Sequence, residues 1–509
     1  MNHLRAYCLV VSAVFYIVAG PQSFGLVLAK EAVLRIPVFS HPPSRGNPFV
    51  ANGVPSSLVW FALFDPLIRT DVYGKLEPSL ALRWEALDKN TWRFYLRRGI
   101  AFSNGEEFDA SAVKTTLDWL HKGAGRGLIV GREVSGIKRV DVLGPYTLDI
   151  VTVTPDAILP KRLTSVMIVA PKAWIQGGVS MFSKTPVGTG PFRLVSWNKG
   201  GAIEVVKNQS SWRPPHVQRI LFYQVSDASA LVQALQSGQM DLATTVSPEA
   251  AVELEASGYR RVLSPTGQVM ALGINVEGST VHSLRNVKVR RALNMAINRA
   301  AITNIIMLGT QKPASQPGTP LTFGYNPSLK PFEYNPVLAR TLLKQSGFDN
   351  NIELEAEVVV GSNIHSSTIY QMVQQDFRKI GVNLKLRSIV FSDWIRKYSS
   401  GSWSSDFFSL AWNSEPYYDV VRPMEYYSCK KAIPFFCDNE LASQLDATGS
   451  IFDQSLRLKK LQDLSRIYRN LAPSIFIIEI SEIAMLAEHV KNYNVKTRVP
   501  VYEDLKIIR

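Results

Sequence analysis

The sequence lacks the short motifs that mark the common catalytic sites. Its 509 residues contain no G-x-S-x-G nucleophile motif, no H-E-x-x-H zinc motif and no P-loop. The seven histidines lie too far apart for two of them to bind one metal from a single helical turn, although a site built from distant segments would leave no such signal. Ser135 and Lys138 match S-x-x-K, but no K-T-G follows them. We therefore predict a recognition protein that is not an enzyme and that has no cofactor or metal.

Cysteine is also scarce, with three residues in the chain. Cys8 lies at the start of an apolar run, whereas a lipidated cysteine should follow such a run, so the sequence does not favour a lipoprotein. If the N-terminal residues are removed on export, Cys429 and Cys437 remain as an even pair in a compartment where disulfides persist. We predict that these two cysteines form a disulfide, and the alternative is a pair of separate buried thiols.

Charge is nearly absent from the first 29 residues, where Arg5 is the only formally charged side chain. The apolar run that follows it, Ala6–Ala19, has the layout of a signal peptide. Val27 and Ala29 supply the small residues that a cleavage before Lys30 requires. We predict a cleaved signal peptide and export to a periplasm. An uncleaved anchor is the alternative, although the run is shorter than the roughly 18–20 residues of a membrane span.

The net charge is strongly positive, at +14, and becomes +13 when Arg5 is removed. Such a charge could serve an anionic partner, but an exported protein does not meet nucleic acid, and the basic residues are scattered along the chain. The densest basic group, RNVKVRRAL from Arg285, has a helical pattern typical of a solvated face. We therefore predict no nucleic-acid partner.

Most of the chain after residue 30 alternates helix-like and strand-like segments. Helices are predicted after Asp109, Asp227 and Asn335, whose side chains can cap a first turn, and over STIYQMVQQDFRKIG up to Gly381. Each is followed at once by a β-rich segment, which indicates an α/β fold. The residues expected on the buried faces are Val113, Leu117 and Leu120; Leu231 and Leu235; Leu338 and Leu342; and Ile369, Met372, Val373, Phe377 and Ile380.

The stretch TWRFYLRRGIAFSNGEEF, from Thr91, has a different pattern. Trp92, Phe94 and Leu96 alternate with polar or partly polar residues, as in a strand with one buried face. The pair Asn104-Gly105 is typical of a tight turn, since glycine accepts a positive φ. We predict a half-exposed antiparallel hairpin here.

A family likeness appears in several long stretches. PLIRTDVYGKLEPSLALRWEALDKNTWRFYLRRGIAFSNGEEFDASAV resembles the signature region of the family 5 extracellular solute-binding proteins, the peptide, dipeptide and nickel-binding components of ABC importers. PVGTGPFRLVSWNKGGAIEVVKNQSSW, LVQALQSGQMDLATTV and NVKVRRALNMAINRAAITNIIMLGT, which leads to FEYNPVLARTLLKQSGF, agree with the family in order and spacing. Two departures are Asn298, where relatives usually have Asp, and the sequence Tyr418-Asp419-Val420, which lacks the Asp-Pro of many relatives.

The resemblance implies an α/β, bilobal periplasmic-binding-protein fold of class II, with an additional subdomain and a hinge between two lobes. No Pro-rich or low-complexity linker separates the segments, which suits lobes joined by crossing strands. The implied organisation is a signal peptide over 1–29, a first-lobe core subdomain over 30–70, 188–267 and 482–509, an additional subdomain over 71–187, and a second lobe over 268–481.

The resemblance also implies a function: capture of a short peptide or peptide-like solute by hinge closure, and delivery to the membrane permease subunits of an ABC importer. We expect a monomer whose partners are this ligand and the permease. The alternatives within the same class are an opine, an oligosaccharide or a nickel chelate. A secreted hydrolase and a structural or chaperone-like envelope protein are alternatives from other classes.

The stretch WNSEPYYD, residues 412–419, places three aromatic rings and two carboxylates in eight residues, in the region where relatives contact ligand. We expect Trp412 and Tyr418 to supply flat apolar walls with polar tips. Asn413 is expected to contact the ligand as well. Asp419 is expected to pair with a ligand cation such as a peptide α-amine.

The counterpart of this loop is predicted in ANGVPSS. Asn52 and Gly53 can offer amide or backbone groups near the start of a helix at Ser56. The alternative interpretation is that the aromatic residues of 412–419 pack in a core beside the Cys429–Cys437 loop, and that Asp419 caps a turn.

Overall fold

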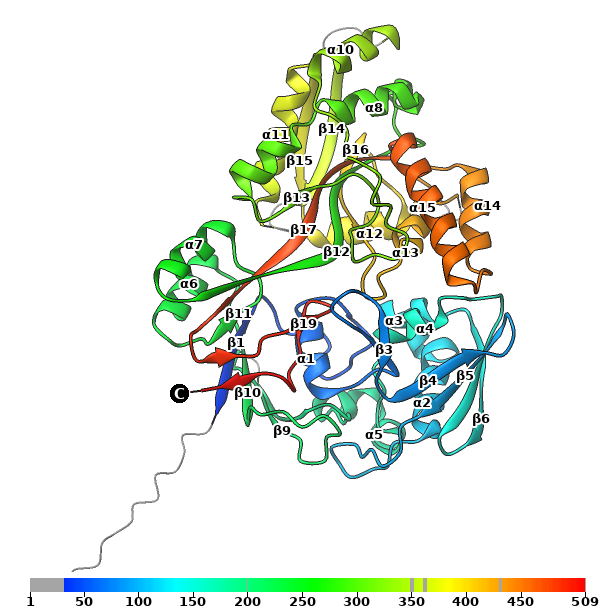
Figure 1. Cartoon of the computed structure of the whole chain (residues 1–509), viewed down its shortest axis with the longest axis vertical. Helices are drawn as coiled ribbons and strands as arrows, with labels where there is room; N and C mark the ends of the chain where they lie inside the picture. The colour runs from blue at the N-terminus through cyan, green and yellow to red at the C-terminus, as the bar shows by residue number, and fades with distance from the viewer. Residues whose placement is uncertain (1–31, 199, 348–351, 360–363, 430–432, 509) are drawn as a thin grey trace, which may run out of the picture. The chain divides into compact units, whose positions relative to one another are not determined.

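The computed structural model describes residues 32–508 apart from 199, 348–351, 360–363 and 430–432 (Figure 1). The predicted signal peptide and the cleavage site before Lys30 lie outside these residues. Within the described ranges, the helices are all too short or too polar to cross a bilayer.

Three sheets contain most of the described strands, and parallel and antiparallel pairs occur together. The first has the order β1 (Val33–Val38), β10 (Arg219–Gln224), β9 (Ile203–Lys207), β8 (Phe192–Trp197). The second has the order β4 (Ala81–Ala86), β5 (Thr91–Leu96), β7 (Thr147–Thr152), β6 (Ile137–Gly144). The third has the order β11 (Leu242–Ala243), β17 (Ser474–Leu486), β12 (Arg260–Ile274), β16 (Phe407–Asn413), β14 (Ile352–Val359), β15 (Val382–Ile389), with β13 (Lys312–Pro313) on β17.

Helices connect most of these strands, as an α/β fold requires. They are α1 (Ser56–Leu63), α2 (Ala110–His121), α3 (Ile129–Glu133), α4 (Leu159–Arg162), α5 (Pro171–Lys184), α6 (Ala228–Gln236), α7 (Pro248–Ala256), α8 (Val287–Met295), α9 (Arg299–Ala301), α10 (Pro336–Gln345), α11 (Ser366–Arg378), α12 (Phe391–Ser400), α13 (Val421–Glu425), α14 (Asn439–Thr448) and α15 (Gln454–Leu471). Short ladders pair β2 (Ile68–Thr70) with β3 (Leu76–Pro78), β18 (Val490–Lys491) with β21 (Lys506–Ile507), and β19 (Val495–Lys496) with β20 (Val499–Pro500).

The predicted helix caps are confirmed. Asp109, Asp227 and Asn335 each accept a hydrogen bond from a backbone N–H of the first turn of α2, α6 and α10. The helix predicted up to Gly381 is α11, and this glycine follows it with φ of 80°. Such caps are encoded by residues within a few positions of each other, which is why they can be predicted from the sequence.

The predicted face of one helix is wrong. In α10 the residues that face the core are Ala339 and Leu343, whereas Leu338 is 42% exposed and Leu342 is half-buried. The apolar periodicity fits two faces one residue apart, and packing against α8 selects the second.

The predicted hairpin is only partly present. Trp92, Phe94 and Leu96 are buried as expected, and Gly105 adopts φ of 88° in a tight turn. However, β5 pairs with β4 and β7, and the only pairing across the turn in this described region is an isolated bridge between Ala101 and Glu107. The alternation identified the strand correctly, but it carries no information about which strands lie beside it.

Two separate hydrophobic cores organise the described residues. One is formed by buried residues that range from Leu34 to Leu242 and from Ala484 to Leu505, and the other by residues from Val269 to Ile478 together with Ile158. A smaller cluster lies around Leu235. Two large cores fit two lobes. The exact boundaries of the subdomains remain a prediction.

The long strands β12 and β17 run side by side and take part in both regions (Figure 1). Their regular pairing is interrupted between Pro265 and Val269. On one side of the interruption β17 also pairs with β11, through Met485 and Leu486. On the other side β12 also pairs with β16, through its residues up to Ile274. The interruption therefore marks the place where the chain passes from one core to the other.

Candidate functional site

The loop 413–419 begins beside the interruption in β12. Asn413 ends β16 opposite Gln268, and the Ser414 N–H donates to the Gly267 carbonyl oxygen at 3.0 Å. A Cβ atom on Gly267 would lie 2.6 Å from Ser414 Oγ and 2.9 Å from the Tyr418 ring. Only glycine allows this close approach, so Gly267 of β12 helps to position the loop.

A partly buried ion-pair cluster surrounds the first carboxylate of the loop. Glu415 accepts hydrogen bonds from Gly267 N at 2.9 Å, Gln268 Nε2 at 2.8 Å and Arg498 Nη1 at 3.3 Å. Arg498 also donates to Glu482 of β17. Burial raises the pKa of Glu482, and the Arg498 guanidinium opposes this rise. Three elements that are distant in the sequence thus meet at one guanidinium.

A cavity of about 230 Å³ adjoins this cluster. Its wall includes Tyr418, Arg498, Asp71 and the apolar side chains of Leu263 and Leu321. A few polar groups among apolar walls are typical of small-molecule sites, which range from roughly 300 Å³ upward. At about 230 Å³ the cavity is therefore somewhat smaller than this range.

The turn 71–75 forms one wall of this cavity. Its Asp71 carboxylate accepts hydrogen bonds from the N–H groups of Tyr73 and Lys75. Gly74 has φ of 76°, and a Cβ atom there would lie 2.5 Å from the Leu321 carbonyl oxygen and 3.2 Å from Tyr418 Cβ. The turn is thus in close contact with Leu321 and Tyr418, and this contact requires glycine.

Trp412 does not line the cavity. Its ring is fully buried and stacks on Tyr427, with centroids 3.5 Å apart, and its Nε1 donates to Ser474 Oγ at 3.0 Å. Tyr468 and Phe476 surround it further. These contacts are those of a core residue with a satisfied polar atom.

Asp419 is also fully buried and is paired within the chain. Its carboxylate accepts from Arg457 Nη1 at 2.7 Å, Arg457 Nη2 at 3.1 Å and Lys161 Nζ at 3.0 Å. Burial alone would raise the pKa of Asp419, but Arg457 and Lys161 hold it below its usual range. Both cationic partners come from the protein.

The remaining predicted residues lie apart from one another. Asn413 Oδ1 accepts from the Glu415 N–H at 2.8 Å. Asn52 is half-buried, and its Nδ2 atom is buried without a hydrogen-bond partner in the described part of the chain. Gly53 is exposed, and its carbonyl oxygen accepts from Ser57 N at the start of α1. Across the described residues, no hydrogen bond joins Asn52 or Gly53 to the loop.

A disulfide joins Cys429 to Cys437, which follow the loop in the sequence. Phe435, within the closed segment, packs edge-on against Tyr427 at 4.7 Å and against Phe408 at 4.9 Å. The crosslink therefore lies beside the aromatic core that contains Trp412.

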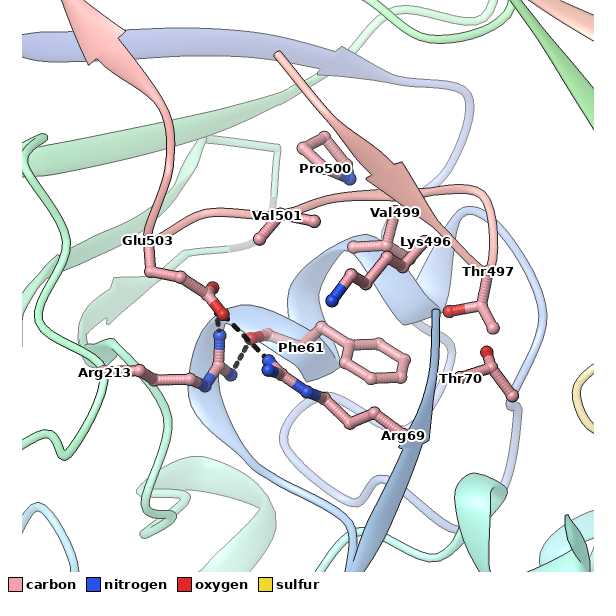
Figure 2. Close-up of a pocket in the computed structure, with 10 residues that line it drawn as sticks. All are labelled: Phe61, Arg69, Thr70, Arg213, Lys496, Thr497, Val499, Pro500, Val501 and Glu503. Atoms are coloured by element: carbon pink, nitrogen blue, oxygen red, sulfur yellow. Dashed lines mark hydrogen bonds and ion pairs between the residues drawn. The ribbon is translucent and has the colours of Figure 1, made fainter. Parts of the chain in front are cut away.

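A second, much smaller cavity of about 20 Å³ lies at the C-terminal segment, which is enough for roughly one water molecule. Figure 2 shows Glu503 between Arg213 and Arg69, at 2.7 and 2.9 Å from their nearest nitrogens. Burial would raise the pKa of Glu503, but the two guanidiniums lower it to about 2. These ion pairs hold the C-terminal segment in place. The remaining space is too small for a solute.

Metal coordination finds no support in the described residues, where no three side chains of His, Cys, Asp or Glu gather as a candidate site. Sequence reasoning missed Arg498 and Glu482, which carry no local signal. Glu415 was within the stretch singled out, and its position three residues after Trp412 was the only available hint.

Comparison with known proteins agrees with this architecture. The family model described as bacterial extracellular solute-binding proteins, family 5 middle, matches residues 75–433. The glutathione-binding protein GsiB of Escherichia coli (strain K12) is 30% identical over 351 residues, which are 67% of this chain and 67% of that protein.

Solved structures share the fold over nearly the whole chain. NikA from Brucella suis in complex with Fe(III)-EDTA has a TM-score of 0.82 at 22% identity, over 94% of this chain and 100% of its own. The periplasmic binding protein DppA from Helicobacter pylori in complex with peptide STSA has a TM-score of 0.78 at 22% identity, over 94% and 98%. The α/β, bilobal fold and the resemblance seen in the sequence are confirmed: the chain belongs to the family 5 bacterial extracellular solute-binding proteins.

Proposed function

We propose that the protein captures a short peptide or peptide-like solute in the periplasm, by closure of its two lobes, and delivers it to the permease of an ABC importer. Members of the family bind solutes for transport, and this general role is shared by the chain. The observation that carries the finer proposal is the 230 Å³ cavity beside the interruption in the pairing of β12 and β17, lined by the turn 71–75, by Leu321 and Tyr418, and by Arg498.

The charges around this cavity support a solute with a cationic group. Glu415, Glu482 and Asp71 contribute three carboxylates, against the single guanidinium of Arg498. A ligand ammonium would gain charge-assisted hydrogen bonds in such a site, and a ligand carboxylate could share Arg498. Peptides and glutathione carry both groups.

The side chains proposed to contact the solute are Tyr418, Arg498 and Glu415. Tyr418 and Arg498 line the cavity, and Glu415 orients Arg498. Asn413 and Asn52 stay candidates: Asn52 has a buried amide nitrogen without a partner in the described structure, which a ligand carbonyl could satisfy. Gly53 stays a candidate through its backbone. Trp412 and Asp419 are proposed to support the site without touching the solute, because Tyr427 and Ser474 contact the first, and Arg457 and Lys161 contact the second.

A solute panel tests the proposal. Thermal shift and calorimetry of the purified protein would be run with glutathione, the peptide STSA and a nickel–histidine complex, while mass spectrometry identifies any solute that co-purifies. We expect one saturable site for a peptide-like member. Arg498→Gln should weaken it at least tenfold, and Arg139→Gln, which removes an exposed arginine of β6 paired with Asp141, should not. Binding of the nickel complex alone would contradict the proposed solute class.

The export, localisation and assembly state are proposed with it. We propose that residues 1–29 act as a cleavable signal and that the mature chain works as a monomer. The periplasmic relative DppA supports the compartment. N-terminal sequencing of the protein from a periplasmic extract tests the cleavage before Lys30, and an intact N-terminus would contradict it.

A further inference from the structure

The loop 413–419 contacts a second region besides the cavity: the residues between Glu133 and Thr164. This region belongs to the predicted additional subdomain, yet Ile158 is part of the hydrophobic core formed by residues 269–478. Ala157 N also donates to the Gly449 carbonyl oxygen at 2.8 Å. The two regions are therefore in direct contact through an apolar side chain and a backbone hydrogen bond.

Glu133, the last residue of α3, is at the centre of the polar contacts. Its carboxylate accepts a hydrogen bond from the Tyr417 hydroxyl at 2.9 Å and from Arg422 Nε and Nη2 at 3.2 and 3.1 Å. The side chains of Glu133 and Arg422 are only 10% and 13% exposed. Both Arg422 nitrogens donate to Glu133 Oε1, while Oε2 accepts from Tyr417, so the enclosed carboxylate holds two partners with charge-assisted hydrogen bonds.

Arg422 also contacts the start of the loop. Its remaining terminal nitrogen, Nη1, donates to the Asn413 carbonyl oxygen at 2.8 Å. Glu133 thus holds the loop at two places, at Asn413 through Arg422 and at Tyr417 directly. Between these places lies Glu415, which orients Arg498 at the cavity.

Residues of α4 and of the turn that follows it, 163–165, support the same loop. Lys161 pairs with Asp419, the Thr164 hydroxyl lies 3.5 Å from the Pro416 carbonyl oxygen, and Arg162 Nη1 lies 3.4 Å from the Tyr417 hydroxyl. Arg162 also pairs with Asp156 at 3.1 Å. Of these contacts, those of Glu133 are best suited to a test, because this single carboxylate holds the loop at two places.

We infer that Glu133 is a positioning residue: through Arg422 and Tyr417 it holds the loop 413–419 in the conformation that receives solute, without touching the solute. The inference rests on the proposed function for its effect on affinity, but the ordering of the loop is a statement about the protein alone. Loss of the carboxylate leaves the Arg422 guanidinium buried without its counter-charge, so the loop should loosen at both attachment points.

Hydrogen exchange in the absence of solute tests the ordering. The amides of Ser414, Tyr418 and Val420 are each hydrogen bonded, to Gly267, Ser414 and Phe323 respectively, and report on the loop. In Glu133→Gln we expect at least tenfold faster exchange in a peptide covering 413–421, and no change in a peptide covering β5. Asp141→Asn, which removes an exposed carboxylate from the same subdomain, should leave both peptides unchanged.

Two gentler variants keep the test decisive if Glu133→Gln folds poorly. Tyr417→Phe removes one of the two attachments and should accelerate exchange at 413–421 by a smaller factor. Arg422→Lys keeps the charge, but an ammonium lacks the fork that reaches both Glu133 and Asn413, so its effect should approach that of Glu133→Gln. Uniform acceleration over the whole chain would show a merely structural role and overturn the inference.

The affinity for glutathione, measured by calorimetry, completes the test. We expect a roughly tenfold loss in Glu133→Gln, with the variant still folded. Faster local exchange with unchanged affinity would overturn the claim that the ordering matters for binding, and unchanged exchange would overturn the ordering itself. If no solute of the panel binds the unaltered protein, the proposed function fails, while local acceleration at 413–421 would still support the positioning role.

Discussion

Two carboxylates of the same loop, four residues apart, have opposite environments. Asp419 is fully buried and has two cations of the protein, Arg457 and Lys161, as partners. Glu415 is 12% exposed and shares Arg498, which lines the 230 Å³ cavity, with Glu482. The first cluster is closed by the chain itself, whereas the second borders space for a solute. The sequence therefore shows that both positions carry a carboxylate. Only the partners of each carboxylate show whether it stabilises the protein or borders the cavity.

The largest effect is expected from breaking the closed cluster. Asp419→Asn leaves the Arg457 guanidinium, with a side chain 1% exposed, without its counter-charge, so we expect the free energy of unfolding to fall by about 3–5 kcal/mol. Urea denaturation measures it. Asp141→Asn, at an exposed pair, should change stability by less than about 0.5 kcal/mol. A stable Asp419→Asn protein that had lost only solute binding would reverse the roles assigned to the two carboxylates.

The next largest effect is expected at Gly74, in the turn 71–75 that forms one wall of the cavity. Gly74→Ala introduces a Cβ atom 2.5 Å from the Leu321 carbonyl oxygen at a positive φ, a strain of about 1–3 kcal/mol. We expect solute affinity, measured by calorimetry, to fall by roughly 5- to 100-fold. Gly105→Ala is the matched control, because Gly105 also has a positive φ but open space around its missing Cβ. Equal affinity in the two variants would mean that the turn 71–75 plays no part in closure.

A smaller effect is expected at Glu415. Glu415→Gln keeps the size of the side chain but removes the charge that holds Arg498 Nη1 at 3.3 Å. We expect about a tenfold weaker affinity for the best solute of the panel, equivalent to about 1.4 kcal/mol, with a smaller loss of stability than in Asp419→Asn. Glu353→Gln, at an exposed pair with Lys385, should bind normally. Unweakened binding by Glu415→Gln would remove the electrostatic part of the proposal.

The smallest effect is a difference in pH dependence with opposite signs. The pKa of Asp419 is lowered by Arg457 and Lys161 against the effect of burial, so its stabilisation is present above about pH 4 and is lost as the pH falls further. Burial raises the pKa of Glu482 despite Arg498, so its contribution is present below about pH 4 and is lost as the pH rises.

Denaturation of Asp419→Asn, Glu482→Gln and the unaltered protein between pH 3 and 8 measures this difference. The stability advantage of the unaltered protein over Asp419→Asn should shrink toward low pH, and its stability relative to Glu482→Gln should decrease toward high pH. Parallel profiles would mean that both carboxylates experience similar surroundings.

The sequence predicted the family, the α/β class and the helix caps at Asp109, Asp227 and Asn335, because each depends on residues close together or on long motifs. It failed where packing decides between equivalent local patterns. Leu338 and Leu342 fit a helical stripe as well as Ala339 and Leu343 do, and only the neighbouring helix distinguishes them.

The candidate site shows the same limit more strongly. Trp412 and Asp419 looked like ligand contacts, but a partner 15 residues away, Tyr427, and one 38 residues away, Arg457, enclose them. Arg498 reaches Glu415 from 83 residues along the chain, and Lys161 reaches Asp419 from 258 residues. Contacts of this kind join segments that are far apart in the sequence, so no local pattern encodes them.

A crystal structure of the protein with the best-binding solute of the panel tests the central claim most directly. The account predicts that the solute occupies the cavity between the turn 71–75 and Tyr418, with polar atoms within hydrogen-bond distance of Arg498 or Glu415, while Lys161 and Arg457 remain on Asp419. A solute bound to Asp419 in place of Lys161, or bound outside the cavity, would contradict it.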